Sequence, residues 1–352
     1  MTPATEFAAD PPSPAPGGLA TSLFDYDLPE ASVAQHPVEP RSAARLLVDL
    51  DPDGSAGHET VADLPLHLGE GDVVVVNETK VLPARLTLRK ASGGAAEVFL
   101  LEAEPSSGHT GMWRGLVRPG RRLPPGTVLY GDGGTPVVEV GERLDLDGTR
   151  RVRLLADLSD HGAIPLPPYI HEPLADPDRY QTVYARLEGS VAAPTAGLHL
   201  TAEVLDAIRA RGVEVHAVDL AVGLGTFRPL TGHALDDHVM HEERYAVPAE
   251  TLEACAAARR TVAVGTTTLR ALESAARTGE LAGRTDVFIR PGFDFRVVDV
   301  LLTNFHQPRS TLLVLLSAFA GHQRWRRRYG EALAEGYRFL SFGDAMLVSR
   351  AG

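Results

Sequence analysis

The chain has 352 residues, of which 44% are hydrophobic and 23% charged, as is usual for a globular protein. The single cysteine excludes an internal disulfide framework and fits a reducing compartment, and the net charge of −12 argues against a sequence-blind nucleic-acid binder. The best candidate for a membrane span, residues 310–320, is about half the ~20 residues that a transmembrane helix needs. No basic region followed by an apolar core opens the chain, so we predict no signal peptide and expect a cytoplasmic protein.

Residues 1–20 are rich in Pro, Ala and Gly, a composition that predicts a disordered leader. Residues 25–37 read as an extended entry followed by a short helix. A strand is expected over residues 45–50, followed by a turn at 51–54.

Between residues 71 and 157 the pattern changes to short β-rich runs separated by Gly, Pro or Asp. That spacing favours an antiparallel sandwich or barrel over βαβ units. We therefore predict an inserted all-β domain at 71–157, flanked by the two parts of a catalytic domain at 21–70 and 158–352.

After the insert, helical and strand patterns alternate, which indicates a mainly parallel α/β domain. The predicted helices begin with 201–212, where Thr201 is an N-cap candidate and Gly212 a stop. The other predicted helices cover 249–260, 268–279, 311–321 and 325–336. The predicted strands cover 213–223 and 261–266, and three more are expected within 286–293, 296–305 and 337–348.

Polar side chains gather where predicted strands run into helices, the place at which α/β folds bind ligands. Thr266 and Thr267 follow one strand, with Arg270 one turn into the next helix. Asn304 and His306 follow another strand and offer amide and imidazole groups. The alternative for the threonines is that one of them only caps the helix.

The stretch 188–201, EGSVAAPTAGLHLT, precedes a helix and places Glu188, Ser190, Thr195 and His199 close together. It contains no Gly-x-Ser-x-Gly, so no serine-hydrolase elbow is predicted. Residue chemistry alone therefore indicates a ligand pocket and no particular reaction.

Two further motifs are weaker signals. Phe227 follows a Gly-x-Gly-Thr turn and is suited to stacking on a flat ring, but the spacing is not the dinucleotide fingerprint. The run 236–245 contains two histidines and two glutamates without a cysteine cluster, so we predict no metal site. The arginine clusters at 118–123 and 324–330 are read as solvated surface.

Read together, these stretches resemble the S-adenosylmethionine:tRNA ribosyltransferase-isomerase family of queuosine biosynthesis. The resemblance runs from Phe24 to Ser349 and rests on FDYDLPEASVAQHP, GDVVVVNETKVLPARL, IPLPPYI, RYQTVYARLEGSVAAPTAGLHLT, VGLGTFRP, HVMHEERY, VAVGTTTLRALES, TNFHQPRSTLLVLLSAFAG and YGEALAEGYRFLSFGDAML. It implies an α/β main domain of barrel-like character with an inserted β-barrel domain.

The resemblance also implies a reaction. The ribosyl part of S-adenosylmethionine is transferred to 7-aminomethyl-7-deazaguanine at the tRNA wobble position and rearranges, giving epoxyqueuosine, adenine and methionine. S-adenosylmethionine is then a consumed substrate, no cofactor is expected, and the expected partners are S-adenosylmethionine and tRNA, with no membrane and a monomeric chain.

Roles are hypotheses from residue type. The proton next to the sulfonium needs a base, for which we consider His199 or His306, with Glu188 as the alternative. The remaining pocket candidates are Ser190 and Thr195 in the loop; Asn304, Thr266 and Thr267 for the ribose or methionine end; Phe227 for stacking; Arg270 for a carboxylate or phosphate; and Asp344 for an ammonium or deazaguanine edge. Arg45, Asn77, Lys80 and Arg85 are held equally as tRNA contacts or structural residues.

Four positions depart from the usual family pattern: Ala221 stands for His, Glu78 for Asp, Leu200 for Phe and Gln307 for Leu. If the histidine is catalytic in the family, Ala221 implies a slow enzyme or a changed substrate. Two alternatives therefore stay open, an enzyme of the same scaffold acting on a small deazapurine or amine, and a non-catalytic tRNA-binding relative.

Overall fold

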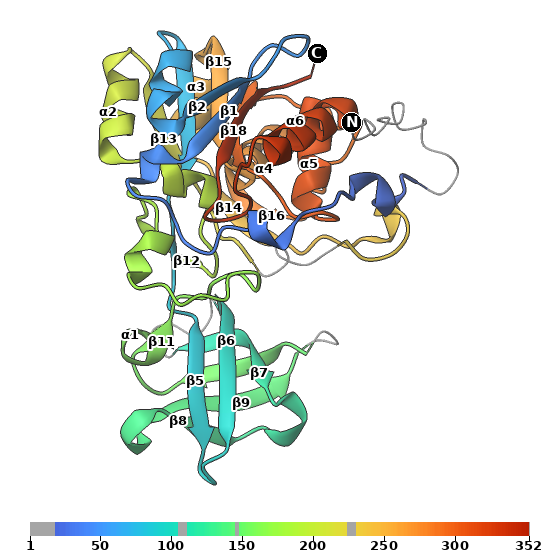
Figure 1. Ribbon diagram of the computed structural model, residues 1–352. Helices are drawn as coiled ribbons and strands as arrows, with labels where there is room; N and C mark the ends of the chain where they lie inside the picture. Colours follow the sequence, from blue (N-terminus) through green and yellow to red (C-terminus); the bar gives the residue numbers. More distant parts are fainter. Residues whose placement is uncertain (1–17, 105–110, 145–147, 224–229, 352) are drawn as a thin grey trace.

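The computed structural model describes residues 18–104, 111–144, 148–223 and 230–351. They form a larger α/β domain from which a smaller β-barrel projects (Figure 1). The predicted leader lies outside the described residues except for residues 18–20, where Ala20 forms a bridge with Ala234. No helix in these ranges is long and apolar enough to span a membrane.

The α/β domain is built on a nine-stranded mixed sheet. Its strand order is β16-β14-β13-β3-β15-β17-β18-β1-β2, in which β13, β3, β15 and β17 are parallel neighbours and β18 runs antiparallel to β17. The strands are β1 (Arg45–Asp49), β2 (Gly57–Thr60), β3 (Asp72–Asn77), β13 (Glu214–Leu220), β14 (Glu243–Ala246), β15 (Arg260–Val264), β16 (Ala282–Thr285), β17 (Val300–Asn304) and β18 (Ala345–Ser349).

The central strand β3 shows why this sequence makes a two-sided sheet. All six of its residues are buried, as expected for a strand covered on both faces. Val73 and Val75 pack into the core on one face, and Val74 and Val76 pack into the core on the other.

Helices cover both faces of the sheet (Figure 1). Helix α2 (Ala202–Ala210) packs on one side, where Thr201 caps it by accepting a hydrogen bond from the Val204 N–H, as predicted. The other side carries α3 (Ala249–Ala257), α4 (Thr266–Thr278), α5 (Thr311–Ala320) and α6 (His322–Ala334). The short helix α1 (Leu158–His161) follows the barrel.

The smaller domain is a closed barrel of order β5-β6-β7-β10-β9-β8, because β8 also pairs with β5. A short strand, β11, adds to β5 from outside the ring. These strands are β5 (Arg85–Lys90), β6 (Ala95–Ala103), β7 (Met112–Arg118), β8 (Thr127–Tyr130), β9 (Pro136–Arg143), β10 (Arg150–Leu154) and β11 (Gly162–Ala163). The class, a mixed α/β fold with an inserted β-barrel, is confirmed.

Two expectations need correction. The insert begins at β5 rather than at residue 71, because β3 pairs with β13 and β15 in the main sheet. Between the main sheet and the barrel, β4 (Thr79–Val81) pairs with β12 (Leu187–Ser190) in a two-stranded connection. The main sheet ends at β16 and β2, which do not pair in the described chain, so closure belongs to the insert.

The strand predicted within 286–293 is also displaced. The strand is β16, at Ala282–Thr285, where it pairs with β14. The following residues are irregular and contain a turn at Gly292, whose φ of +91° is readily available only to glycine. Apolar residues such as Ile289 made this segment look like a strand, but they pack as a loop against the core.

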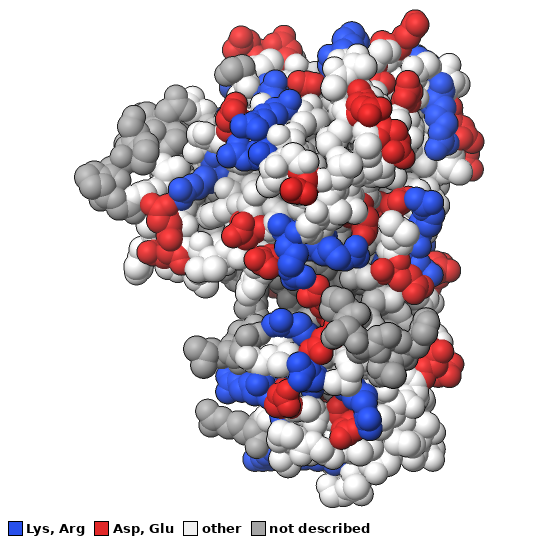
Figure 2. All heavy atoms as spheres, turned by 180° about the vertical axis from the view of Figure 1, so that it is seen from behind, with Lys and Arg blue, Asp and Glu red and all other residues white. Residues whose placement is uncertain are grey.

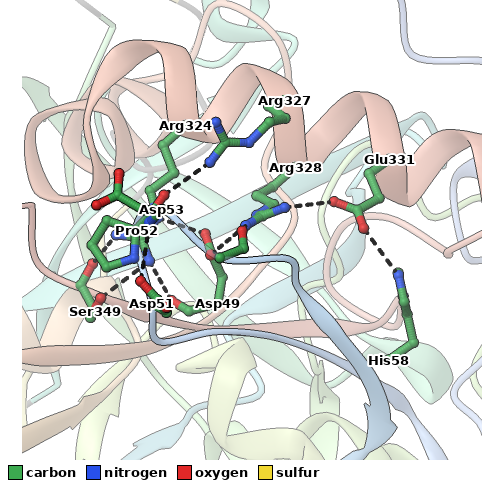
Figure 3. A network of polar contacts seen from close by, with 11 residues as sticks. Asp49, Asp51, Pro52, Asp53, His58, Arg324, Arg327, Arg328, Glu331 and Ser349 are labelled. Atoms are coloured by element: carbon green, nitrogen blue, oxygen red, sulfur yellow. Dashed lines mark hydrogen bonds and ion pairs between the residues drawn. The ribbon is translucent and has the colours of Figure 1, made fainter.

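The basic run in α6 is not a solvated surface. Arg324 and Arg328 are buried and bind the carboxylate of Asp49 at 2.7 and 2.9 Å (Figure 3). Arg328 also pairs with Glu331, which contacts His58. This network joins α6 to the end of β1. Removal of Asp49 would leave the buried Arg324 without a carboxylate and Arg328 with Glu331 alone, at a cost of about 3–5 kcal/mol.

Candidate functional site

The largest group of predicted polar residues meets at the carboxyl ends of β15 and β17. The chain passes from β3 to β13 on one side of it and later returns to β15 on the other side. Where the strand order reverses in this way, a crevice opens beyond the carboxyl ends of the strands. We call this crevice the strand-end cleft, and its lining includes Tyr169, Ala193, Pro194, Thr195, Ala196, Val222, Gly265, Thr266, Thr267, Thr303, Asn304, Phe305, His306, Gln307, Ser310, Leu312, Leu340 and Ser341.

The start of α4 brings its threonines into the cleft. Gly265 is the N-cap residue, with a φ of +91° and no side-chain cap, so the alternative that a threonine only caps the helix is wrong. Thr266 and Thr267 line the cleft, and Thr267 Oγ1 accepts a hydrogen bond of 3.2 Å from Asn77 Nδ2. Thr268 points back to the Val264 carbonyl at 2.7 Å.

Asn304 is the hub of the cleft floor. Its Oδ1 accepts from the Thr195 hydroxyl at 2.9 Å, and its Nδ2 donates to the Leu340 carbonyl at 3.2 Å and pairs with His199 Nε2 at 2.9 Å. The amide is therefore fixed in orientation, and it connects the 188–201 loop to β17.

His199 lies behind Asn304 rather than in the cleft. It borders a separate small hollow together with Arg41 and Arg179. Burial, helped by the charges of Arg338, Arg41 and Arg179, lowers the pKa of His199 to about 4, so the imidazole is neutral at pH 7. Its Nε2 is occupied by Asn304, which makes it a residue that positions the amide.

His306, in contrast, lines the cleft directly. Its Nε2 pairs with the Thr303 hydroxyl at 2.8 Å, and its backbone N–H donates to the Tyr329 hydroxyl at 2.9 Å. Burial lowers the pKa of His306 to about 3, so the ring is neutral at pH 7.

The 188–201 loop is shaped by two small residues. The Ser190 hydroxyl donates to the Ala192 carbonyl at 2.6 Å and accepts from the Val222 N–H at 3.0 Å, which ties the loop to the end of β13. A Cβ at Gly197 would lie 1.9 Å from the Tyr184 hydroxyl, so only glycine fits there. Ser190 is thus buried beneath the cleft, while Thr195 reaches it.

Several predicted residues are not brought into the cleft. The Glu188 side chain is 61% exposed and pairs with Lys80 at 3.0 Å, which removes it from any position as the base of this site. Arg85 pairs with Glu97 on the rim of the barrel. Phe227 lies outside the described residues.

Three other candidates are held by structural contacts. The Asp344 carboxylate accepts from the backbone N–H groups of Arg45 and Arg338 at 2.9 and 2.7 Å, so it holds β1 beside β18 instead of facing a ligand. The Arg45 guanidinium stacks on Tyr337 at 3.8 Å. Asn77, at the end of β3, donates from Nδ2 to the Leu220 carbonyl at 3.0 Å and accepts at Oδ1 from the Leu220 N–H at 3.1 Å, so it satisfies the backbone at the end of β13.

The departures from the family pattern have separate surroundings. Ala221 borders a charged hollow between the domains, beside the strand-end cleft. Gln307 lines the cleft itself. Glu78 pairs with Arg186 at 2.7 Å, and Leu200 is fully buried in the core.

Sequence reasoning missed several members of the cleft. Tyr169 and Ser341 contribute hydroxyls that bond each other at 2.7 Å, and burial raises the pKa of Tyr169 to about 12. Ser310 lines the cleft while it caps α5. Tyr169 and Ser341 lie in IPLPPYI and SFGDAML, motifs that carried the family resemblance but offered no strand-to-helix signal.

Arg270 lies apart from the cleft floor, in a second chamber lined also by His238, Met240, His241, Glu243, Val287, Phe288, Ile289, Thr311, Leu312 and Leu315. It forms a buried ion pair with Glu243. Over the described ranges, no group of three or more His, Cys, Asp or Glu side chains is arranged to hold a metal ion.

A polar cleft above the ends of parallel strands, floored by a fixed amide and a neutral imidazole, defines an α/β enzyme with an inserted β-barrel. A family model described as "Queuosine biosynthesis protein" matches residues 21–348, and the chain belongs to that family.

Its relatives are full-length matches. The chain is 50% identical over 347 residues to the S-adenosylmethionine:tRNA ribosyltransferase-isomerase of Symbiobacterium thermophilum, covering 94% of this chain and 100% of the relative. It is 49% identical to that of Thermus thermophilus, covering 92% and 98%. A crystal structure of S-adenosylmethionine tRNA ribosyltransferase from Thermotoga maritima matches with a TM-score of 0.54 and 38% identity, covering 93% of this chain and 100% of that one.

Proposed function

We propose that the protein is an S-adenosylmethionine:tRNA ribosyltransferase-isomerase, which consumes S-adenosylmethionine and modifies 7-aminomethyl-7-deazaguanine at the wobble position of tRNA to epoxyqueuosine. Full-length identity of about half to relatives with that name supports the activity. The observation that carries the assignment to this chain is the strand-end cleft, in which Thr195, Asn304 and His306 meet as one polar floor.

The reaction needs removal of a proton from the carbon beside the sulfonium, since the positive sulfur makes that carbon acidic. We assign this step to His306, because it is the imidazole that lines the cleft. When Nε2 donates its hydrogen to Thr303, the lone pair lies on Nδ1, the nitrogen available as the base. His199 then acts through Asn304 as a positioning residue.

The hydroxyls of the cleft suit the sugar of the substrate. Thr195 and Thr267 are each already bonded to an amide, so their oxygens are held in place to bind the ribose. Tyr169 and Ser341 on the opposite loops supply donors for a leaving adenine, since burial keeps the Tyr169 phenol protonated by raising its pKa. Pre-oriented donors of this kind lose little entropy when a substrate binds.

The charge on the surface is mixed in sign. Figure 2 shows basic side chains interspersed with acidic ones over both domains, so phosphate binding rests on individual residues rather than on one broad basic field. Arg284 is compensated, because it pairs with Glu102 of the barrel and with Glu242. Lys80 and Arg85 are half-exposed beside the domain junction, and each pairs with one carboxylate, Glu188 or Glu97, whereas Arg284 pairs with two. They are the phosphate contacts we assign.

The test uses purified protein, S-adenosylmethionine and tRNA that carries 7-aminomethyl-7-deazaguanine. We expect epoxyqueuosine in the digested tRNA together with an equal amount of free adenine. Matched reactions contain tRNA with unmodified guanine, or free 7-aminomethyl-7-deazaguanine in place of tRNA. Adenine release with free 7-aminomethyl-7-deazaguanine, together with no epoxyqueuosine in the tRNA reaction, would contradict the proposal and identify a small-molecule acceptor.

A further inference from the structure

Arg270 is a buried arginine with hydrogen-bond donors that have no partner among the described residues. Its side chain is 6% exposed, and its Nη1 binds Glu243 Oε2. Its Nε and Nη2, the two nitrogens of one edge of the guanidinium, are buried and have no hydrogen-bond partner within the part of the chain that the structure describes. A buried donor without a partner is costly, so an edge left open in this way points to a missing ligand.

The open edge has the geometry for one particular kind of group. Parallel N–H bonds from Nε and Nη2 match the two oxygens of a carboxylate or a phosphate. The Glu243 carboxylate already lies against the same guanidinium, and its Oε1 accepts from the Gly223 N–H at 3.0 Å. A phosphate dianion would add two negative charges beside that carboxylate, whereas a monoanionic carboxylate adds one and its repulsion is smaller.

The chamber around Arg270 has one apolar wall beside its polar groups, which are Glu243, Thr311 and two histidines. Met240, Phe288, Ile289 and Leu315 form that apolar wall. Leu312 lines both this chamber and the strand-end cleft, so the two spaces lie on either side of one side chain. An occupant of both spaces would place a polar sugar in the cleft and a short aliphatic chain past Leu312 towards Arg270.

S-adenosylmethionine has that layout: an adenosine, a sulfonium, two methylene groups and an α-amino acid. We infer that the second chamber binds the methionyl end, with the α-carboxylate bidentate on Nε and Nη2 of Arg270. The inference rests on the proposed function, since it takes S-adenosylmethionine as the occupant of the strand-end cleft. In this arrangement Arg270 fixes the end of the substrate that leaves as methionine, and it orients the sulfonium above His306.

The test is calorimetric binding of three ligands to the wild-type protein: S-adenosylmethionine, its decarboxylated form, and 5′-methylthioadenosine. The first two share the adenosine, sulfonium and amine and differ only in the carboxylate. We expect wild type to bind S-adenosylmethionine at least ten-fold more tightly than the decarboxylated form. Arg270→Gln is expected to bind both with the affinity that wild type has for the decarboxylated form, and Arg270→Lys to keep part of the difference.

Arg277→Gln is the matched control, because Arg277 is an exposed arginine two turns further along α4 and should keep the wild-type ratio. Equal affinity of wild type for the two sulfonium ligands would overturn the inference without any variant, as would an Arg270→Gln protein that keeps the ratio. If Arg270→Gln does not fold, the wild-type ratio and Arg270→Lys still decide. Wild type that binds none of the three ligands would overturn the proposed function itself, so the two failures are distinguishable.

Discussion

The two buried histidines of the site make the stability of the main domain depend on pH. In the folded protein, burial lowers the pKa of His199 to about 4 and that of His306 to about 3. In the unfolded chain both imidazoles titrate near their ordinary pKa of about 6.5. Between these values the unfolded chain binds more protons than the folded one, so the free energy of unfolding falls as the pH falls through 6.5.

The size of the effect follows from the same pKa values. At pH 5 an unfolded histidine is almost fully protonated, while a folded one with a pKa of about 4 or about 3 is largely neutral. Each histidine then favours unfolding by about 2 kcal/mol relative to pH 8, and the two together by about 4 kcal/mol. His306→Gln should therefore lose about half of this pH dependence, as should His199→Gln.

Urea unfolding at pH 8, 6 and 5 measures the effect, followed by the fluorescence of Trp325. This residue is fully buried in the α/β domain, and the other tryptophan, Trp113, lies in the barrel, so a Trp113→Phe background isolates the domain that holds the site. His233→Gln is the control, because that exposed imidazole is hydrated in both states. Histidine variants with the same pH dependence as the control would refute the reasoning that these rings are buried and neutral.

Three further predictions test the loop, the structural acid and the RNA contact. Gly197→Ala should lower the free energy of unfolding by about 1–3 kcal/mol, because its Cβ would lie 1.9 Å from the Tyr184 hydroxyl. Partial recovery in a double variant with Tyr184→Phe would identify that clash, since Thr182 Cγ2 would still lie 2.9 Å away, and a fully stable single variant would contradict it. Asp344→Asn should cost about 1–3 kcal/mol in urea unfolding and leave the Kd for S-adenosylmethionine unchanged, since its oxygens accept backbone N–H groups; the opposite pattern would place Asp344 at the ligand. Lys80→Ala should weaken tRNA binding and reduce the slope of log K against log salt by about 1, and an unchanged slope would mean that Lys80 serves only its pair with Glu188.

Part of the cleft lining could be predicted from the sequence, because the strand-end rule depends only on local order. Thr195, Thr267 and Asn304 each stand where a strand or an extended loop runs into a helix, and parallel packing brings those positions together. The same rule could not say which side of a turn a residue faces. Thr195 and His199 belong to one 3-10 turn, yet Thr195 reaches the cleft and His199 lies behind Asn304.

The domain boundary was misplaced for a related reason. The run DVVVVN of β3 is short and rich in valine, and its length and composition resemble those of the barrel strands. Its partners β13 and β15 lie more than a hundred residues away, and only their pairing assigns β3 to the main sheet. The structural roles of Asp344 and Arg45 were hidden in the same way, because their partners are distant backbone and ring groups.

The central claim, that the strand-end cleft is the catalytic centre with His306 as its base, is tested most directly by single-turnover release of adenine. Calorimetry first gives the Kd of wild type and of His306→Gln for S-adenosylmethionine. Each protein, in excess over the tRNA that carries 7-aminomethyl-7-deazaguanine, is then mixed separately with that tRNA and S-adenosylmethionine. Loss of a general base typically costs about 10²–10⁴-fold, so we predict a rate at least 100-fold lower in the variant with a Kd changed by less than about three-fold. Adenine release by His306→Gln at the wild-type rate would contradict the claim.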